Sequence, residues 1–267
     1  MTSIKKLQDL SGRNSLITGA TGRLGMEMAD TLAELGSDLI LVDIPGSDLK
    51  KLEQKIFNKW NVNVLSYECD LENNESRLDL ADKIKKTKLG INCLINNAAF
   101  LGDGNLSGYS VPFYEQSINT WQRAIEVNLT AAFHLCQLFG PIIESNKGGN
   151  IINITSIYGR YAPDWDLYEG TSMGNPAAYA SSKGGLEQLT RWLSTTLAPN
   201  VRVNAISPGG IFRNQDKDFV EKYNAKTPLG RMAVEDDFRG AITFLSTDMS
   251  KYVTGQILFI DGGWGVW

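Results

Sequence analysis

Residues 15–25 read Ser15-Leu16-Ile17-Thr18-Gly19-Ala20-Thr21-Gly22-Arg23-Leu24-Gly25, and this stretch decides the fold. Its first four residues form an apolar run typical of a buried strand, and a helical pattern follows over residues 23–35. Glycines at the junction let the backbone turn sharply and let a pyrophosphate group approach main-chain N–H groups. A lone glycine triplet also fits a simple strand-to-helix turn, so its meaning depends on the rest of the chain.

Asp43 supports the nucleotide interpretation, because it ends the next apolar run, 24 positions after Gly19. A carboxylate at this place accepts hydrogen bonds from an adenosine ribose and repels a 2′-phosphate. The residue therefore predicts a dinucleotide site that favours NAD over NADP. Arg23 lies within the glycine loop and could either reach a 2′-phosphate or point to solvent, so NADP stays the second candidate.

Apolar runs alternate with helical patterns along the whole chain. This alternation is typical of an α/β fold, a doubly wound sheet of about seven parallel strands with helices on both faces. With no linker or repeat between the elements, residues 1–267 are expected to form one domain. The expected strands are 15–18, 39–42, 62–67, 93–96, 150–154, 202–206 and 257–260, and the expected helices are 23–35, 49–58, 75–86, 121–139, 178–197 and 236–245.

Three segments interrupt the alternation, at 99–119, 157–176 and 211–228. Each follows the carboxyl end of an expected strand, where open α/β sheets bind their ligands. Long loops in compact domains are usually functional or disordered, and the aromatic residues in the first two argue against disorder. We expect all three segments to be substrate loops.

Composition restricts the class of protein. Hydrophobic residues make up 42% of the chain, the net charge is −4 and the pI is about 5.2. These values argue against nucleic acid or an anionic membrane as the main partner. Cys69, Cys93 and Cys136 are expected to be buried thiols, and the single histidine, His134, a packed core residue and not a metal ligand. The polar N-terminus and the lack of a membrane-length apolar run predict a cytoplasmic protein.

Tyr179 and Lys183 lie four residues apart in an expected helix, so their side chains share one face. A phenol has a pKa near 10, and a neighbouring ammonium group favours the phenolate and lowers that pKa. The pair therefore suggests a tuned general acid/base. The same spacing also occurs on ordinary exposed helices.

The remaining landmarks follow one another in a recognisable order. They are Thr18–Gly25, Asp70, Asn96-Asn97-Ala98-Ala99, Asn128, Ser156, Tyr179 with Lys183, Ser207-Pro208-Gly209-Gly210, Tyr252-Val253-Thr254-Gly255-Gln256 and Asp261-Gly262-Gly263. In this ordered set, and over essentially its whole length, the chain resembles the short-chain dehydrogenase/reductase family, in its compact single-domain branch with a Rossmann-type fold.

The resemblance implies a role for each matching residue. Tyr179 would exchange a proton with the substrate oxygen, and Lys183 would lower the Tyr179 pKa and bind the nicotinamide ribose. Ser156 would hold the substrate oxygen, and Asn128 would hold a water that completes a proton relay. Taken singly, each residue also fits a structural role, such as a helix cap. The implied cofactor contacts are Gly19, Thr21, Gly22, Arg23, Leu24, Gly25, Asp43, Asp70, Leu71, Asn97, Ala98, Ala99, Asn128, Tyr179, Lys183, Pro208, Gly209 and Ile211.

The chain departs from the family pattern in four places. The middle glycine, Gly22, comes one residue earlier than in the compact branch, and Ala99 replaces a commoner glycine. Residues 161–175 look like an insertion that should cover the active site. Arg213 stands where a threonine is common, and an arginine there suits an anionic substrate group.

Residues 168–173 and 207–215 are similar to bacterial oxidoreductases of nonulosonic acid and flagellin glycan pathways. The predicted substrate residues are Ser156, Tyr158, Glu169, Ser172 and Arg213, which fit a polar, sugar-like or anionic molecule; no metal is predicted.

The resemblance implies an NAD(P)-dependent oxidoreductase that interconverts a secondary alcohol and a ketone. The alternatives are a sugar-nucleotide epimerase or dehydratase that uses bound NAD, and a non-catalytic nucleotide-binding regulator. The family also implies a homotetramer or a homodimer, with the apolar C-terminal residues 259–267 near a subunit contact. Beyond a small-molecule substrate and copies of itself, no partner is expected.

Overall fold

A computed structural model of the chain describes residues 2–100, 106–146 and 148–266. Residues 101–105, which belong to the first predicted loop, lie outside the described residues. The described part contains one seven-stranded sheet in which all neighbouring strands are parallel, in the order β3-β2-β1-β4-β5-β6-β7. The strands are β1 (Asn14–Thr18), β2 (Asp38–Asp43), β3 (Val64–Glu68), β4 (Cys93–Asn96), β5 (Gly149–Ile154), β6 (Val201–Pro208) and β7 (Ile257–Ile260).

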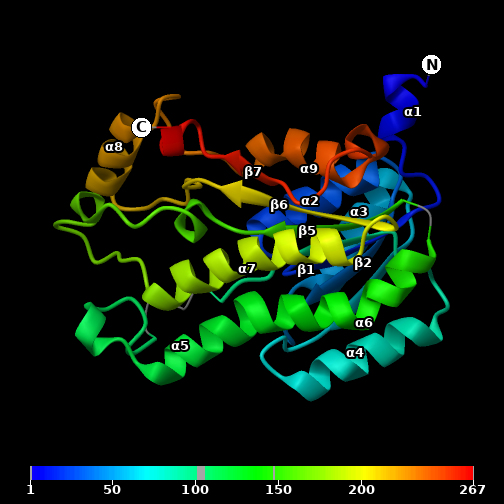
Figure 1. The fold of residues 1–267 in the computed structure, drawn as a ribbon, viewed down its shortest axis with the longest axis horizontal. Coiled ribbons are helices and arrows are strands. Elements are labelled where there is room, and N and C mark those ends of the chain that lie inside the picture. Colours follow the sequence, from blue (N-terminus) through cyan, green and yellow to red (C-terminus); the bar gives the residue numbers. More distant parts are fainter. Residues whose placement is uncertain (1, 101–105, 147, 267) are drawn as a thin grey trace.

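Helices cover both faces of this sheet, as the alternating pattern predicts. Helices α4 and α6 lie on one side of the strands and α9 lies on the other (Figure 1). The α-helices are α1 (Ile4–Gln8), α2 (Arg23–Glu34), α3 (Leu49–Trp60), α4 (Asn74–Lys86), α5 (Ile118–Ile125), α6 (Ala131–Ser145), α7 (Ala177–Thr196), α8 (Lys217–Lys226) and α9 (Arg239–Ser246).

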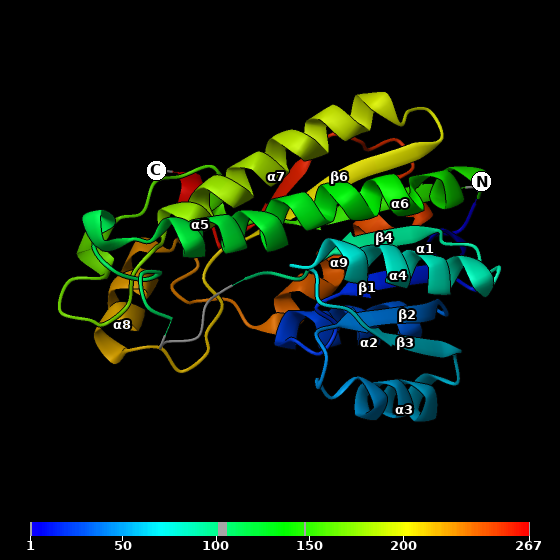
Figure 2. The ribbon, with the colours of Figure 1, turned by 90° about the horizontal axis from the view of Figure 1, so that it is seen from below.

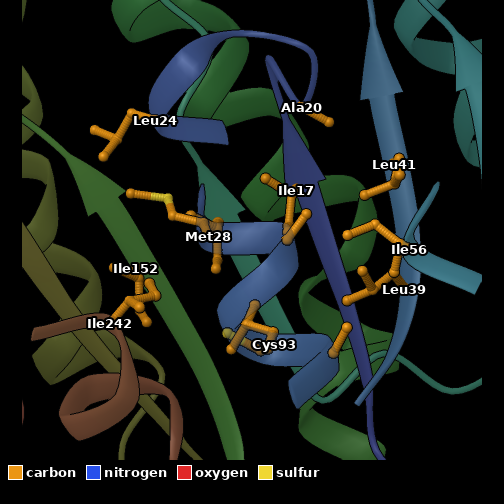
Figure 3. Packing of buried hydrophobic residues seen from close by; sticks show 14 of the residues in the cluster. Ile17, Ala20, Leu24, Met28, Leu39, Leu41, Ile56, Cys93, Ile152 and Ile242 are labelled. Atoms are coloured by element: carbon orange, nitrogen blue, oxygen red, sulfur yellow. The ribbon is translucent and has the colours of Figure 1, made fainter. Parts of the chain in front are cut away.

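Successive strand residues point to opposite faces and so divide the core in two. On β1, Ile17 packs into the cluster formed with α2, α3 and α9, whereas Leu16 packs into the cluster with α4, α6 and α7. Figure 3 shows the first cluster, where Met28 and Ile56 come from helices and Leu39 from a strand. Both strand faces are therefore buried, which explains why the strands read as continuous apolar runs.

Two expectations about the elements are wrong in detail. The helix expected over 121–139 begins earlier, at Ile118, and is divided by a π-helical turn, Glu126–Thr130, before α6 continues to Ser145. The segment 211–228 is not simply a loop, because it contains the ten-residue helix α8. Near the N-terminus, residues Ile4–Gln8 form the short helix α1.

The segments that follow the strands gather at one end of the molecule. Helix α8 and the C-terminus lie at this end in Figures 1 and 2, and the arrow of β6 points toward it. The segment 157–176 packs there against α8, because Leu167 is fully buried with Phe219, Tyr223 and Met232. A second small core therefore holds the segment in place.

Candidate active site

The glycine loop and the Asn96-Asn97-Ala98-Ala99 landmark meet at the carboxyl ends of β1 and β4. The side-chain amide of Asn97 donates to the carbonyls of Thr18, at 2.9 Å, and Gly19, at 3.0 Å. The Thr18 hydroxyl in turn accepts the backbone N–H groups of Asn97 and Ala98, both at 3.1 Å. Strand order reverses between these two strands, and open α/β sheets bind ligands at such a point.

The glycine loop owes its shape to Gly19 and Gly25. Gly19 has a φ of +63°, and a Cβ there would lie 2.8 Å from the Cα of Ala98. A Cβ on Gly25 would lie 2.1 Å from the carbonyl oxygen of Gly19. Gly22 is different: it caps α2 with an ordinary φ of −64°.

Asp43 binds the loop directly. Its Oδ2 accepts the backbone N–H and the hydroxyl of Thr21, both at 2.7 Å, and its Oδ1 accepts the backbone N–H of Ile44, also at 2.7 Å. The carboxylate is therefore fixed beside the N-terminus of α2, where helix N–H groups favour an anion such as a phosphate.

A cleft of about 660 Å³ runs along these strand ends. Its volume lies within the range of about 300–1,000 Å³ usual for small-molecule sites, and the glycine loop and Asp43 form one wall, so the residues fit a dinucleotide. Every predicted cofactor residue lines the cleft except Asn128: Gly19, Thr21, Gly22, Arg23, Leu24, Gly25, Asp43, Asp70, Leu71, Asn97, Ala98, Ala99, Tyr179, Lys183, Pro208, Gly209 and Ile211.

Tyr179, Lys183 and Ser156 come together on this cleft. Ser156 hydrogen-bonds with the Tyr179 hydroxyl, and the Lys183 Nζ lies 5.8 Å from the centre of the Tyr179 ring. Lys183 is 2% exposed and donates to the Ile154 carbonyl at 2.7 Å.

Burial decides the pKa of both titratable groups. It lowers the pKa of Lys183 from 10.5 to about 8. It also raises the pKa of Tyr179, although the Ser156 hydrogen bond and the charge of Arg213 act in the opposite direction. In this structure desolvation of the phenolate dominates the Tyr179 pKa, and the lowering of that pKa by Lys183 stays a prediction.

Asn128 is buried behind the cleft, within the π-helical turn. Its Oδ1 accepts the backbone N–H of Phe100 at 2.6 Å, and its Nδ2 donates to the Ser182 hydroxyl at 3.0 Å. Ser182 then donates to the Tyr179 carbonyl at 2.8 Å. Asn128 thus links the segment after β4 to the helix that carries Tyr179 and Lys183.

A second cavity, of about 260 Å³, adjoins the cleft. Of the predicted substrate residues, Ser156 and Tyr158 line it, whereas Glu169 and Ser172 are exposed and line neither cavity. Sequence reasoning missed Asn175 and Tyr223 and did not single out Tyr168 among the aromatic residues of segment 157–176, yet all three line the second cavity. The aromatic content of the insertion was the signal available for Tyr168.

Arg213 lines the first cleft and is exposed. The Nε of Arg213 lies 3.8 Å from Oε1 of Glu235, so this ion pair is loose. The positive charge of Arg213 acts to lower the pKa of Tyr179.

The other sequence expectations concern residues outside the cleft or on its margin. His134 is only half-buried and accepts a hydrogen bond from Nε of Arg77 at 3.0 Å, so it is not a core residue. Cys69, Cys93 and Cys136 are buried free thiols. Within residues 2–100, 106–146 and 148–266 there is no metal-binding cluster of histidine, cysteine and carboxylate side chains. Among the described helices, none has the length and apolar character needed to span a membrane.

Comparison with known proteins gives consistent results. Residues 19–265 match the family model described as enoyl-(acyl carrier protein) reductase. The chain is 31% identical to post-translational flagellin modification protein A of Campylobacter coli over 258 residues, which are 96% of this chain and 100% of the relative. It is 30% identical to 3-oxoacyl-[acyl-carrier-protein] reductase FabG of Aquifex aeolicus over 259 residues, covering 95% and 98% of the two chains.

A solved structure is also similar over the full chain. Gluconate 5-dehydrogenase from Burkholderia cenocepacia, in complex with NADP and tartrate, matches with a TM-score of 0.87 and 25% identity, covering 99% of this chain and 100% of the other. The family model, the relatives and the seven-stranded parallel sheet agree with the ordered landmarks of the sequence. The chain therefore belongs to the short-chain dehydrogenase/reductase family and is an NAD(P)-dependent oxidoreductase.

Proposed function

We propose that the protein interconverts a secondary alcohol and a ketone on a small, polar, sugar-like substrate, with Tyr179 as the acid/base and NAD as the preferred cofactor. One observation carries the proposal. Ser156 and Tyr179 line both the cleft that fits the dinucleotide and the adjoining cavity of about 260 Å³. A substrate oxygen between them would meet a proton donor at the place where the two cavities join.

The nicotinamide, when bound, supplies or accepts the hydride, and the protein supplies position and the proton. Tyr179 keeps its proton at neutral pH, because burial raises its pKa, and so it can donate to the oxygen of a ketone. Ser156 shares that oxygen and stabilises the charge that develops on it. Lys183, charged below a pKa of about 8, would favour the phenolate in the reverse direction and bind the nicotinamide ribose.

Asn128 would complete a proton relay behind these groups. It lies in a π-helical turn, a distortion often found at functional sites, and its side chain is already used by Phe100 and Ser182. Backbone groups of the turn are therefore the ones we expect to hold the relay water.

The choice of NAD over NADP rests on Asp43. Its carboxylate is fixed at the adenosine end of the cleft by Thr21 and Ile44, where a 2′-phosphate would meet its negative charge. Arg23 also lines the cleft and favours NADP, the cofactor bound in the similar gluconate 5-dehydrogenase.

The substrate class rests on Arg213 and on the relatives. An exposed arginine on the cleft, near enough for its charge to act on Tyr179, suits a carboxylate or phosphate on the substrate. Similarity to a flagellin modification protein and to a gluconate 5-dehydrogenase supports a polyhydroxylated or acidic sugar derivative.

Tyr179→Phe tests the assigned chemistry. Removing the hydroxyl should lower turnover by about 100-fold or more, the usual contribution of a positioned acid or base, while the dissociation constant for NADH stays nearly the same. The measurements are steady-state nicotinamide absorbance with a panel of polyols and sugar acids, and fluorescence titration with NADH. Near wild-type turnover in this variant would show that another group transfers the proton.

Asp43→Ala tests the cofactor assignment. The variant should narrow the NAD preference by improving kcat/KM for NADP relative to NAD, because it removes the repelling carboxylate. Arg23→Ala is the matched control and should lower only the use of NADP. A wild-type enzyme that already prefers NADP would contradict the interpretation of Asp43.

A further inference from the structure

The second cavity contains a polar cluster that the redox chemistry does not use. Tyr158, from the turn after β5, and Tyr168 and Asn175, from the insertion, line it together with the apolar side chains of Met173 and Phe219. The cavity also shares Ser156 and Tyr179 with the cofactor cleft. A molecule held by the cluster therefore lies next to the reacting atoms.

The hydrogen bonds within the cluster leave a donor in excess. The hydroxyl oxygens of Tyr158 and Tyr168 lie 2.7 Å apart, and burial raises the pKa of both phenols. Both are therefore protonated at neutral pH, and their mutual bond uses one of the two protons. Asn175 lies against both hydroxyls, and its side chain lowers the pKa of each. The second phenol proton is free for a ligand.

Asn175 leaves an acceptor unpaired. The residue is only 8% exposed, and its Oδ1 has no hydrogen-bond partner in the described part of the chain. A buried carbonyl oxygen without a partner is unfavourable, so a ligand group that donates to it is favoured. The cluster thus offers one donor and one acceptor on the wall of the same cavity.

We propose that Tyr158, Tyr168 and Asn175 form a subsite for a substrate hydroxyl other than the one that reacts. A hydroxyl is the smallest group that both donates and accepts a hydrogen bond. It can therefore accept the free phenol proton and donate to the Oδ1 of Asn175. The cavity volume of about 260 Å³ lies below the usual range for drug-sized ligands, which fits a molecule the size of a monosaccharide or a short polyol. The inference rests on the proposed function, because it names the substrate class of that site as a diol or polyol.

The experiment compares diols with the matching mono-alcohol. Cyclohexanol and the 1,2-, 1,3- and 1,4-cyclohexanediols share a reacting carbinol and differ only in the second hydroxyl. Binding to the wild-type enzyme saturated with NADH is measured by calorimetry, and oxidation with NAD is measured by nicotinamide absorbance. At least one diol should bind about 10- to 100-fold more tightly than cyclohexanol, because a site built for a hydroxyl rejects a ligand that lacks it.

Tyr168→Phe and Asn175→Leu should each reduce this preference to within about threefold. Tyr161→Phe is the matched control: it removes a phenol hydroxyl from the same insertion, but that hydroxyl donates to the Gly265 carbonyl at 3.0 Å and Tyr161 lines neither cavity. It should keep the full preference. Thermal melts and NADH titration of each variant check that it is folded.

The possible failures can be told apart. A wild-type enzyme that binds cyclohexanol as tightly as every diol overturns the subsite, even if it oxidises both. An equal loss of preference in Tyr161→Phe and Tyr168→Phe also overturns it, because a general loosening of the insertion would then explain the effect. A diol preference in binding without any nicotinamide turnover keeps the subsite and overturns the proposed function instead.

Discussion

Replacing Lys183 with methionine should abolish turnover and yet leave the folded protein at least as stable at neutral pH. Lys183 is 2% exposed, and burial lowers its pKa from 10.5 to about 8. That difference corresponds to a cost to folding of about 3 kcal/mol for the charged form. Methionine has a similar length and carries no such cost. The change also removes the 2.7 Å bond to the Ile154 carbonyl, and an unpaired buried carbonyl costs about 1–3 kcal/mol. The net change at neutral pH should therefore lie between about zero and a gain of 2 kcal/mol.

The pH dependence of this effect has a definite sign. The folded-state pKa of Lys183, about 8, lies below the unfolded value of 10.5, so between these two values the unfolded chain binds more protons. The free energy of unfolding of the wild type therefore rises with pH across this interval. The cost of the buried charge is fully present below the folded-state pKa and is lost as the pH approaches the unfolded value.

Urea unfolding of the two proteins across this pH interval measures the effect. The difference in free energy of unfolding, methionine variant minus wild type, should fall by about 3 kcal/mol from the lower to the upper end. Using the difference removes the contribution of other groups that titrate in the same range. Lys217→Met, at a lysine whose side chain is 87% exposed, is the control for removing a surface charge. A difference that stays constant with pH for Lys183→Met would refute the argument that this lysine is buried in its charged form.

Two further predictions concern glycine and the C-terminal segment. Gly25→Ala should lower the free energy of unfolding by about 3 kcal/mol, because its Cβ would lie 2.1 Å from the Gly19 carbonyl oxygen. Gly22→Ala, at a residue with an ordinary φ, should change the free energy of unfolding by less than about 1 kcal/mol. Chemical denaturation compares the two variants, and equal effects would contradict the steric argument. Trp264→Ala should raise KM for substrate several-fold with little change in kcat. The reason is that Trp264 stacks on Tyr223, which lines the second cavity, with ring centres 4.5 Å apart. Steady-state kinetics measures both constants, and an unchanged KM would show that the stack does not shape the cavity.

Local patterns in the sequence were enough for the sheet and for most of the cofactor cleft. Apolar runs predicted all seven strands, because a strand buried on both faces must be apolar at successive positions. The glycine loop and Asp43 could be located for a similar reason: a tight turn beside a helix N-terminus requires particular residues at particular positions. Those requirements can be recognised in the sequence without knowledge of the rest of the fold.

The second cavity could not be predicted in the same way. The insertion has no regular period, so nothing in the sequence indicates which of its side chains point inward. Glu169 and Ser172 were chosen for their polarity and are exposed, whereas Asn175 and Tyr168 line the cavity. Their direction depends on packing against α8, an element that the sequence pattern did not distinguish from a loop.

The sequence by itself determined that this chain has a nucleotide-binding α/β sheet and carries Ser156, Tyr179 and Lys183, because these depend on residue types at fixed spacings. Only the tertiary structure decided how those groups titrate. Spacing places Lys183 one helical turn from Tyr179, but burial sets their pKa values, lowering that of Lys183 and raising that of Tyr179. Desolvation depends on every neighbouring element, and so it appears only when the whole chain is folded.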